Sequence, residues 1–144
     1  MTAAARLYTP ELLALAVELA GYPPLDAATV HGEARSATCG STLALDLALD
    51  GDGRIERVGL RVRACAVGQA AAAIFARHAE GREPAEVRAA LDRLATWLGG
   101  EGPAPDWPDL ALVEPARAYP ARHGAMLLPW KAAAAALSSA APAG

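Results

Sequence analysis

Alternating hydrophobic and polar positions in the middle of the chain predict a β-hairpin. Leucine occupies every second position from 43 to 49, and a second alternating run extends from 55 to 62. Residues 50–53 separate the two runs and have the composition of a tight turn. A two-residue period is typical of strands with one buried face, and a short Asp/Gly turn between two such strands indicates antiparallel pairing.

Helical patterns lie on both sides of this hairpin. A first helix is predicted to begin at Pro10 after the capping residue Thr9 and to end before Gly21, because threonine followed by proline is typical of helix starts. A run of small residues after Cys65 predicts a closely packed helix. The further predicted elements are an edge strand within 27–35, helices over 66–79, 84–98 and 126–140, and a short helical turn within 109–114.

This order of elements predicts an α+β fold, with a small antiparallel sheet of about three strands packed against several helices. Hydrophobic residues make up 53% of the chain but aromatic residues only 5%, so small side chains must fill many of the helix contacts. The length of 144 residues fits one domain over 1–144, in which we expect residues 1–6 and 139–144 to be flexible.

Charge and hydropathy exclude two classes of partner. The net charge of −3 gives no basic footprint of the kind that nucleic-acid binders carry. Charge or proline interrupts every apolar stretch before the roughly 20 residues that a membrane span requires. No hydrophobic signal segment precedes Glu11. We therefore expect a cytoplasmic protein that binds neither nucleic acid nor membrane.

The two cysteines carry the candidate chemistry. Cys39 and Cys65 are too few for a disulfide framework and too far apart in sequence for a CxxC pair. Both fall at the open end of the predicted hairpin, within reach of one metal or sulfur site. Cys65 also precedes a helix and follows Arg61 and Arg63, and this positive surrounding favours the thiolate. Two inert buried thiols are the alternative interpretation.

Several segments resemble, in order, the IscU/SufU/NifU-type iron–sulfur cluster assembly scaffolds. The resemblance covers residues 7–137, and the long connector over 99–119 is similar to the SufU branch. It implies the SufE/NifU-like α+β fold. The segments that carry it are CGSTLAL at 39–45, the strand at 55–60, ACAVGQAAA at 64–72, EGR at 80–82, YPAR at 119–122 and LPWKA at 128–132.

The resemblance also implies a ligand set, of which this chain keeps half. Cys39 and Cys65 match the first two cysteines that bind an iron–sulfur cluster or zinc in the family. Ser41 stands where the family has an aspartate, and Ala125 stands where it has a third cysteine. His123 lies two positions before Ala125 and is a candidate replacement, because imidazole also binds zinc and iron. An ordinary surface histidine is the alternative interpretation.

We therefore expect a scaffold or sulfur acceptor rather than an enzyme, with Cys65 as the favoured acceptor. The resemblance implies a cysteine desulfurase as partner and apo iron–sulfur proteins as recipients. Two alternatives remain open. One is a degenerate member that keeps the fold and acts as a non-metal binding or regulatory partner. The other is an unrelated thiol enzyme that pairs Cys65 with His123.

Overall fold

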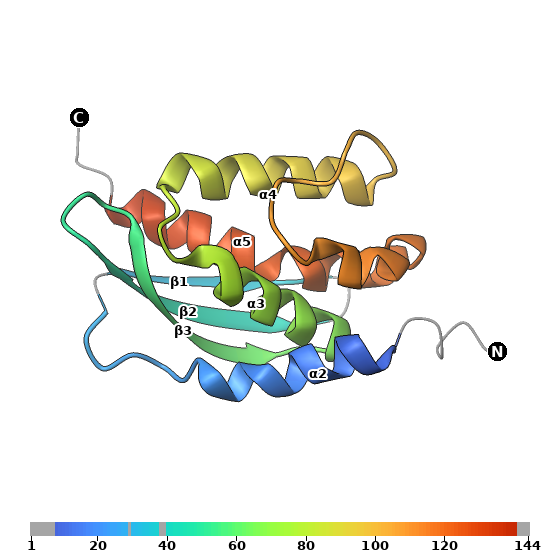
Figure 1. Cartoon of the computed structure of the whole chain (residues 1–144), viewed down its shortest axis with the longest axis horizontal. Helices are drawn as coiled ribbons and strands as arrows, with labels where there is room; N and C mark the ends of the chain where they lie inside the picture. The colour runs from blue at the N-terminus through green and yellow to red at the C-terminus, as the bar shows by residue number, and fades with distance from the viewer. Residues whose placement is uncertain (1–7, 29, 38–39, 141–144) are drawn as a thin grey trace.

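A three-stranded antiparallel sheet forms one layer of the molecule (Figure 1). The computed structural model describes residues 8–28, 30–37 and 40–140. The strands are β1 (Val30–Arg35), β2 (Thr42–Leu49) and β3 (Ile55–Arg63), and β2 lies in the centre. The predicted hairpin is β2 and β3, and the predicted edge strand is β1. Both predictions are confirmed, as is the α+β class.

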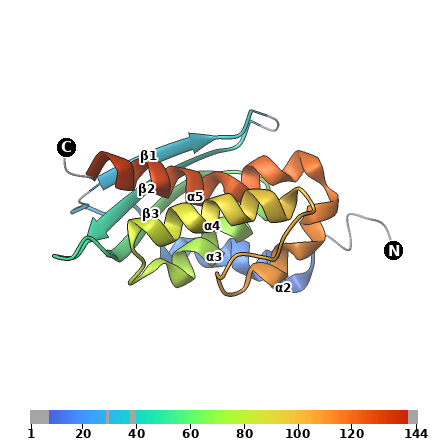
Figure 2. The same cartoon turned by 90° about the horizontal axis from the view of Figure 1, so that it is seen from above.

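Helices cover one face of this sheet, as Figure 2 shows from above. α5 packs against β1 and β2, α3 packs against β3, and α2 and α4 lie against α3 and α5, respectively. Within the described residues, no helix combines the length and apolar character needed to cross a bilayer. The helices are α2 (Pro10–Glu18), α3 (Ala66–Ala79), α4 (Pro84–Leu98) and α5 (Pro120–Ala140), with the 3₁₀ helices η1 (Leu19–Gly21) and η2 (Leu110–Ala118).

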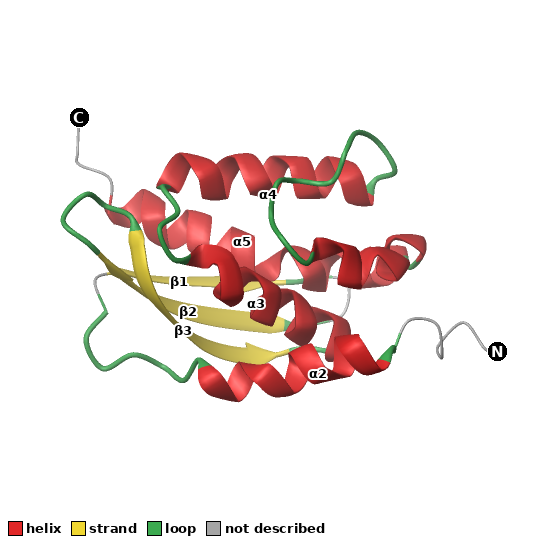
Figure 3. Cartoon of the chain, in the orientation of Figure 1, coloured by secondary structure: helices red, strands yellow, loops and turns green. Residues whose placement is uncertain are grey.

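Two helix boundaries differ from those predicted. The last helix begins at Pro120 rather than near 126, because proline suits a first helical position and the following residues continue the helix through Pro129. The helical turn predicted within 109–114 is the longer 3₁₀ helix η2, which Figure 3 shows between the connector and α5. Both differences lie in the segment that leads into the candidate site.

Small residues let α5 lie directly on β1. The three central leucines of β2 (Leu43, Leu45 and Leu47) are buried on the helix-covered face. On the same face of β1, a Cβ at Gly32 would overlap the carbonyl oxygen of Ala132 in α5. The helix backbone therefore occupies the space that a side chain at Gly32 would need.

Among the described residues, the segment that covers the opposite face of the sheet lies near the β2–β3 turn. Segment 22–28 crosses it there, and a Cβ at Gly59 would lie 2.7 Å from the Pro23 carbonyl oxygen. Buried Asp46 fixes this segment by accepting hydrogen bonds from the Leu25 N–H at 3.0 Å and from His31 Nδ1 at 2.6 Å. The described residues leave the other half of this face open.

An aromatic cluster joins the long connector to the helices. The Phe75 and Trp107 rings stack at 5.3 Å, and Trp130 contacts both rings edge-on. Trp107 Nε1 donates to the Ile74 carbonyl at 3.2 Å, and the Arg82 guanidinium covers the Trp107 ring. These contacts place Trp107 and Trp130 in the packing between the connector, α3 and α5.

The contact at Gly32 makes a testable prediction about stability. Gly32→Ala should lower the free energy of unfolding by about 1–3 kcal/mol, because the new Cβ displaces α5 from β1. Urea unfolding followed by circular dichroism measures the change. Gly51→Ala is the control, since no atom lies within 4 Å of its added Cβ. Equal stability of the two variants would contradict this account.

The buried carboxylate makes a second prediction, about pH. Burial acts to raise the pKa of Asp46, but hydrogen bonds from His31 and the Leu25 N–H outweigh it and leave the pKa below its usual value of 3.8. The ionised form therefore stabilises the fold at pH values above 3.8, and this contribution is lost as the pH falls through the lowered pKa. At neutral pH, Asp46→Asn should lower the free energy of unfolding by about 1–3 kcal/mol.

Unfolding at a series of pH values tests this sign. The stability difference between wild type and Asp46→Asn should shrink as the pH falls below 3.8. Asp92→Asn removes an exposed carboxylate from α4 and should change stability by less than about 0.5 kcal/mol. A difference that grows toward acid pH would refute the assignment of Asp46.

Candidate functional site

Cys65 lies at the junction between β3 and α3. It is the N-cap residue of α3, with an extended backbone, and its half-buried side chain makes no capping hydrogen bond. Its carbonyl accepts from the Gln69 N–H at 2.9 Å, and the Gln69 side chain donates to the Ala64 carbonyl at 2.8 Å. The two bonds fix the backbone on both sides of the thiol. The thiol therefore lies beside the positive end of a helix of 14 residues.

Small residues bring the start of α5 against this junction. A Cβ at Gly68, in the first turn of α3, would lie 2.7 Å from the Ala64 Cβ and 3.1 Å from the Ala125 Cβ. Ala125 is fully buried at this crossing. The position of the family's third cysteine thus lies close to Cys65 in space, although 60 residues separate the two in sequence.

The connection between β1 and β2 completes this end of the sheet. The Ser36 N–H donates to the Ser41 carbonyl at 2.8 Å, and the Gly40 N–H donates to the Ser36 carbonyl at 3.0 Å. A Cβ at Gly124 would overlap the Ser36 hydroxyl, so this connection also touches α5. Ser41 is buried. Cys39 lies outside the described residues, and its role remains a prediction.

His123 is engaged in the packing of η2 against α5. Its Nε2 lies 2.9 Å from the Arg117 carbonyl oxygen, and Arg117 in turn donates to the Trp97 carbonyl and covers the Trp97 ring. A carbonyl only accepts, so Nε2 carries the hydrogen of this bond, and Nδ1 is the nitrogen left to offer a lone pair. A metal ion or a thiol would therefore have to use Nδ1. The prediction that His123 is a ligand stays a prediction.

The other two histidines have carboxylate partners. His31 pairs with Asp46, and His78 Nε2 lies 2.6 Å from Asp109 Oδ2. The hydrogen bond to His78 and then that to Arg77 hold the pKa of Asp109 below its usual value. The first contact joins β1 to β2 and the second joins α3 to the connector, so both histidines have structural contacts.

The described side chains at this end of the sheet do not form a closed metal site. Among residues 8–28, 30–37 and 40–140, no three His, Cys, Asp or Glu side chains are grouped so that they could hold an ion. A structural zinc site has four such ligands. The described residues therefore do not by themselves make up a zinc site, and Cys65 is the one cysteine among them, at the N-terminal end of α3.

Two contributors to this site were not identified from the sequence. Gln69 supports the backbone before Cys65, and Ser36 joins the β1–β2 connection to Gly124. The position of Gln69, a polar residue one turn after a helix start, is a weak sequence signal for its role. No sequence pattern indicates the role of Ser36, because its contact with Gly124 depends on where α5 begins.

Comparisons with known proteins identify relatives among the solved structures. No family model matches the chain, and no curated protein is similar to it in sequence. The chain is similar to the crystal structure of a nitrogen-fixing NifU-like protein (N-terminal) from Brucella abortus, at 32% identity over 95% of this chain and 96% of that one, with a TM-score of 0.85.

A second solved structure shows the same fold at lower identity. It is a putative iron–sulfur cluster assembly scaffold protein for the SUF system from Fervidobacterium islandicum AW-1. The identity is 20%, the matched region covers 92% of this chain and 97% of that one, and the TM-score is 0.79. A hypothetical protein matches less closely, at 19% identity over 88% of this chain and 96% of that one, with a TM-score of 0.66.

The position of Ala125 makes a testable prediction about metal affinity. Ala125→Cys places an additional thiol beside the Ala64–Cys65 junction. It should tighten binding of Zn²⁺ or Co²⁺ by about tenfold or more, which corresponds to about 1.4 kcal/mol. Titration with Co²⁺ under anaerobic conditions, followed by the thiolate–cobalt absorption, measures the affinity.

A matched variant tests whether the effect comes from the position of the added thiol or from any added thiol. Ala135→Cys adds a thiol to an exposed position ten residues later in α5 and should leave the affinity unchanged. If the two variants bind cobalt equally, Ala125 does not belong to the site.

Proposed function

The chain belongs to the NifU-like family of iron–sulfur cluster assembly scaffolds, and from this premise we propose that it accepts sulfur on Cys65 during cluster assembly. The 32% identity over almost the whole length of a NifU-like protein establishes the family. One observation carries the proposal beyond it. Cys65 is a half-buried free thiol at the start of α3, on the end of the sheet where β1, β2 and α5 meet.

The proposed step is a transfer of sulfane sulfur between thiols. The Cys65 thiolate attacks the outer sulfur of a persulfide on the donor protein. A new sulfur–sulfur bond forms on Cys65 as the sulfur–sulfur bond of the donor breaks, and the donor cysteine leaves as a thiolate. No external oxidant or reductant is consumed.

The reduced ligand set shapes the assembly role. Iron and sulfide are the cargo of this protein, and its own Cys39 and Cys65 supply two thiolates to that cargo. Tetrahedral iron in a cluster needs further ligands. Water, a thiol of the partner, or His123 through Nδ1 completes the coordination in this proposal. A cluster held in this way is weakly bound and is passed on readily.

The proposed partners follow from this chemistry. A cysteine desulfurase supplies the persulfide, and apo iron–sulfur proteins receive the assembled cluster. The chain itself carries sulfur and iron and does not turn over a substrate. The second solved relative is a putative scaffold for the SUF system, which supports the same role at the level of the fold.

The sulfur-acceptor proposal predicts a specific loss. Cys65→Ser should reduce persulfide formation on the chain by about tenfold or more, because the attacking thiolate is gone. The measurement uses a purified cysteine desulfurase with L-cysteine, followed by alkylation and mass spectrometry of the peptides that contain Cys39 and Cys65. Cys39→Ser should retain most of the persulfide on Cys65.

Anaerobic reconstitution with iron and sulfide tests the assembly role itself. Wild type should take up more iron and sulfide than the double variant Cys39→Ser/Cys65→Ser. Equal uptake, together with no persulfide on either cysteine, would refute the proposal. The substitutions at Ser41 and Ala125 would then favour the alternative role, in which the fold serves as a non-metal binding partner.

A further inference from the structure

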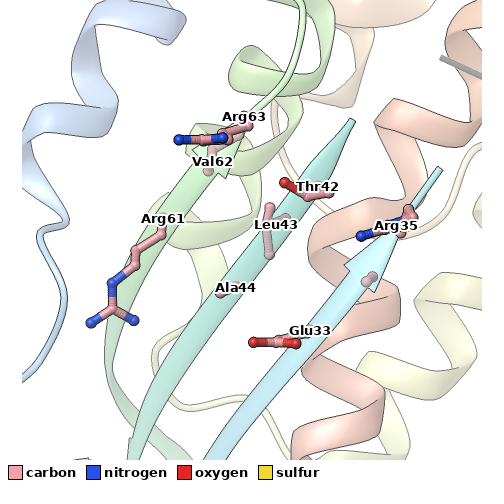
Figure 4. Close-up of a pocket in the computed structure, with 9 residues that line it drawn as sticks. Glu33, Arg35, Thr42, Leu43, Ala44, Arg61, Val62 and Arg63 are labelled. Atoms are coloured by element: carbon pink, nitrogen blue, oxygen red, sulfur yellow. The ribbon is translucent and has the colours of Figure 1, made fainter. Parts of the chain in front are cut away.

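The uncovered half of the outer sheet face forms a trough beside the sulfur site. Segment 22–28 covers the other half, where it contacts Asp46 and Gly59. The uncovered half is hollowed by about 730 Å³, and Figure 4 shows the side chains that line it. The outward-facing residues of this trough are Glu33, Arg35, Thr42, Ala44, Arg61 and Arg63.

The strand order gives the trough its shape. Thr42 and Ala44 are short and form its floor on the central strand β2. Longer side chains on β1 and β3 form the walls. Neighbouring strands are about 4.8 Å apart, so the walls are about 10 Å apart. This is wide enough for one extended polypeptide chain.

The trough is positive, although the protein as a whole is acidic. Three arginines, Arg35, Arg61 and Arg63, face a single carboxylate, Glu33, while the net charge of the chain is −3. All four side chains are exposed. In the described part of the chain, none of the three arginines takes part in an ion pair. Arg61 also lies near enough to Asp46 to help lower the pKa of that carboxyl. Arg35 and Arg63 lie on either side of Thr42, and like charges arranged in this way favour binding of an anion.

The spacing of the arginines matches an extended acidic ligand. Arg61 and Arg63 are alternate residues of β3 and are therefore about 6.8 Å apart along the strand. Alternate residues of an extended peptide repeat at the same distance. Arginine also binds carboxylates through two parallel hydrogen bonds. A segment with acidic residues at alternate positions therefore places successive carboxylates opposite Arg61 and Arg63.

We propose that this trough is the docking surface for an extended acidic segment of the protein that delivers sulfur to Cys65. The inference rests on the proposed function, because only a sulfur donor needs to approach this thiol. Arg63 precedes Cys65 by two residues, so the trough ends close in sequence to the residue that carries the thiol. Glu33 lies across the trough from Arg61, in the row of Ala44, whereas Arg35 and Arg63 lie on either side of Thr42 in the row nearer Cys65. The positive charge is therefore greatest at the end near the thiol.

Fluorescence anisotropy with the full chain tests the ligand class. The probe is a labelled peptide of alternating glutamate and threonine, and a second peptide has the same composition in two blocks. The alternating peptide should bind more tightly than the block peptide, and added salt should weaken its binding. Equal affinity for the two peptides would overturn the proposal. So would displacement of the alternating peptide by inorganic phosphate, when the phosphate supplies the same concentration of negative charge as the peptide.

Charge reversal on each wall tests the location. Arg61→Glu/Arg63→Glu and, separately, Arg35→Glu should each weaken binding of the alternating peptide, the double variant by about tenfold or more. These side chains are exposed, and circular dichroism verifies that the variants fold. The matched control is Arg88→Glu/Arg93→Glu, which reverses two exposed charges on α4. Equal losses in the trough variants and in this control would refute the assigned surface.

Sulfur transfer distinguishes this inference from the function on which it rests. For each variant, the rate of persulfide formation with a cysteine desulfurase is divided by the rate of Cys65 alkylation by iodoacetamide, which corrects for altered thiol reactivity. This ratio should fall for the trough variants and not for the α4 control. An unchanged ratio, with normal transfer to Cys65, would refute the docking surface alone. Loss of transfer in wild type would refute the proposed function.

Discussion

The close approach of α5 to its neighbours is the constraint on which the rest of the structure depends. At Gly32 the helix backbone fills the space of a missing side chain, and at Gly68 it meets α3 through the Cβ of Ala125. Both contacts require small residues on both sides. They explain why glycine and alanine occupy the points of closest approach between α5, β1 and α3, while larger apolar side chains such as Leu45 fill the rest of the core.

Much of this fold could be predicted from the sequence, because its periodic segments are long and clear. The leucines of β2 and the small residues of α3 predicted their elements correctly, and the resemblance of segments such as 64–72 to the scaffold family is confirmed by the structural relatives. The predicted start of α5 was wrong by several residues, because the helix begins at Pro120. Proline at 120 is compatible both with a turn and with a first helical position, and only tertiary packing decides between them.

The site was only partly predictable, for a different reason. Its residues come from four parts of the chain, and their separation in sequence does not indicate which of them are in contact. The resemblance to the family places Ala125 at the position of its third cysteine, and the contacts at Gly68 show that Ala125 lies close to the residue before Cys65. The hydrogen bond from His123 to the Arg117 carbonyl could not be predicted, since it depends on the 3₁₀ helix η2. The arginine-lined trough depends on strand register, which the alternation of residues leaves open.

The aromatic cluster has a consequence for how this protein can be observed. All three tryptophans of the chain are buried, two of them in contact with Phe75, and none lines the trough. Their intrinsic emission therefore monitors the integrity of the core. Loading of Cys65, or docking on the far side of the sheet, takes place in an optically silent region. A shift in tryptophan emission on adding a ligand would accordingly signal a rearrangement of the helices rather than binding itself.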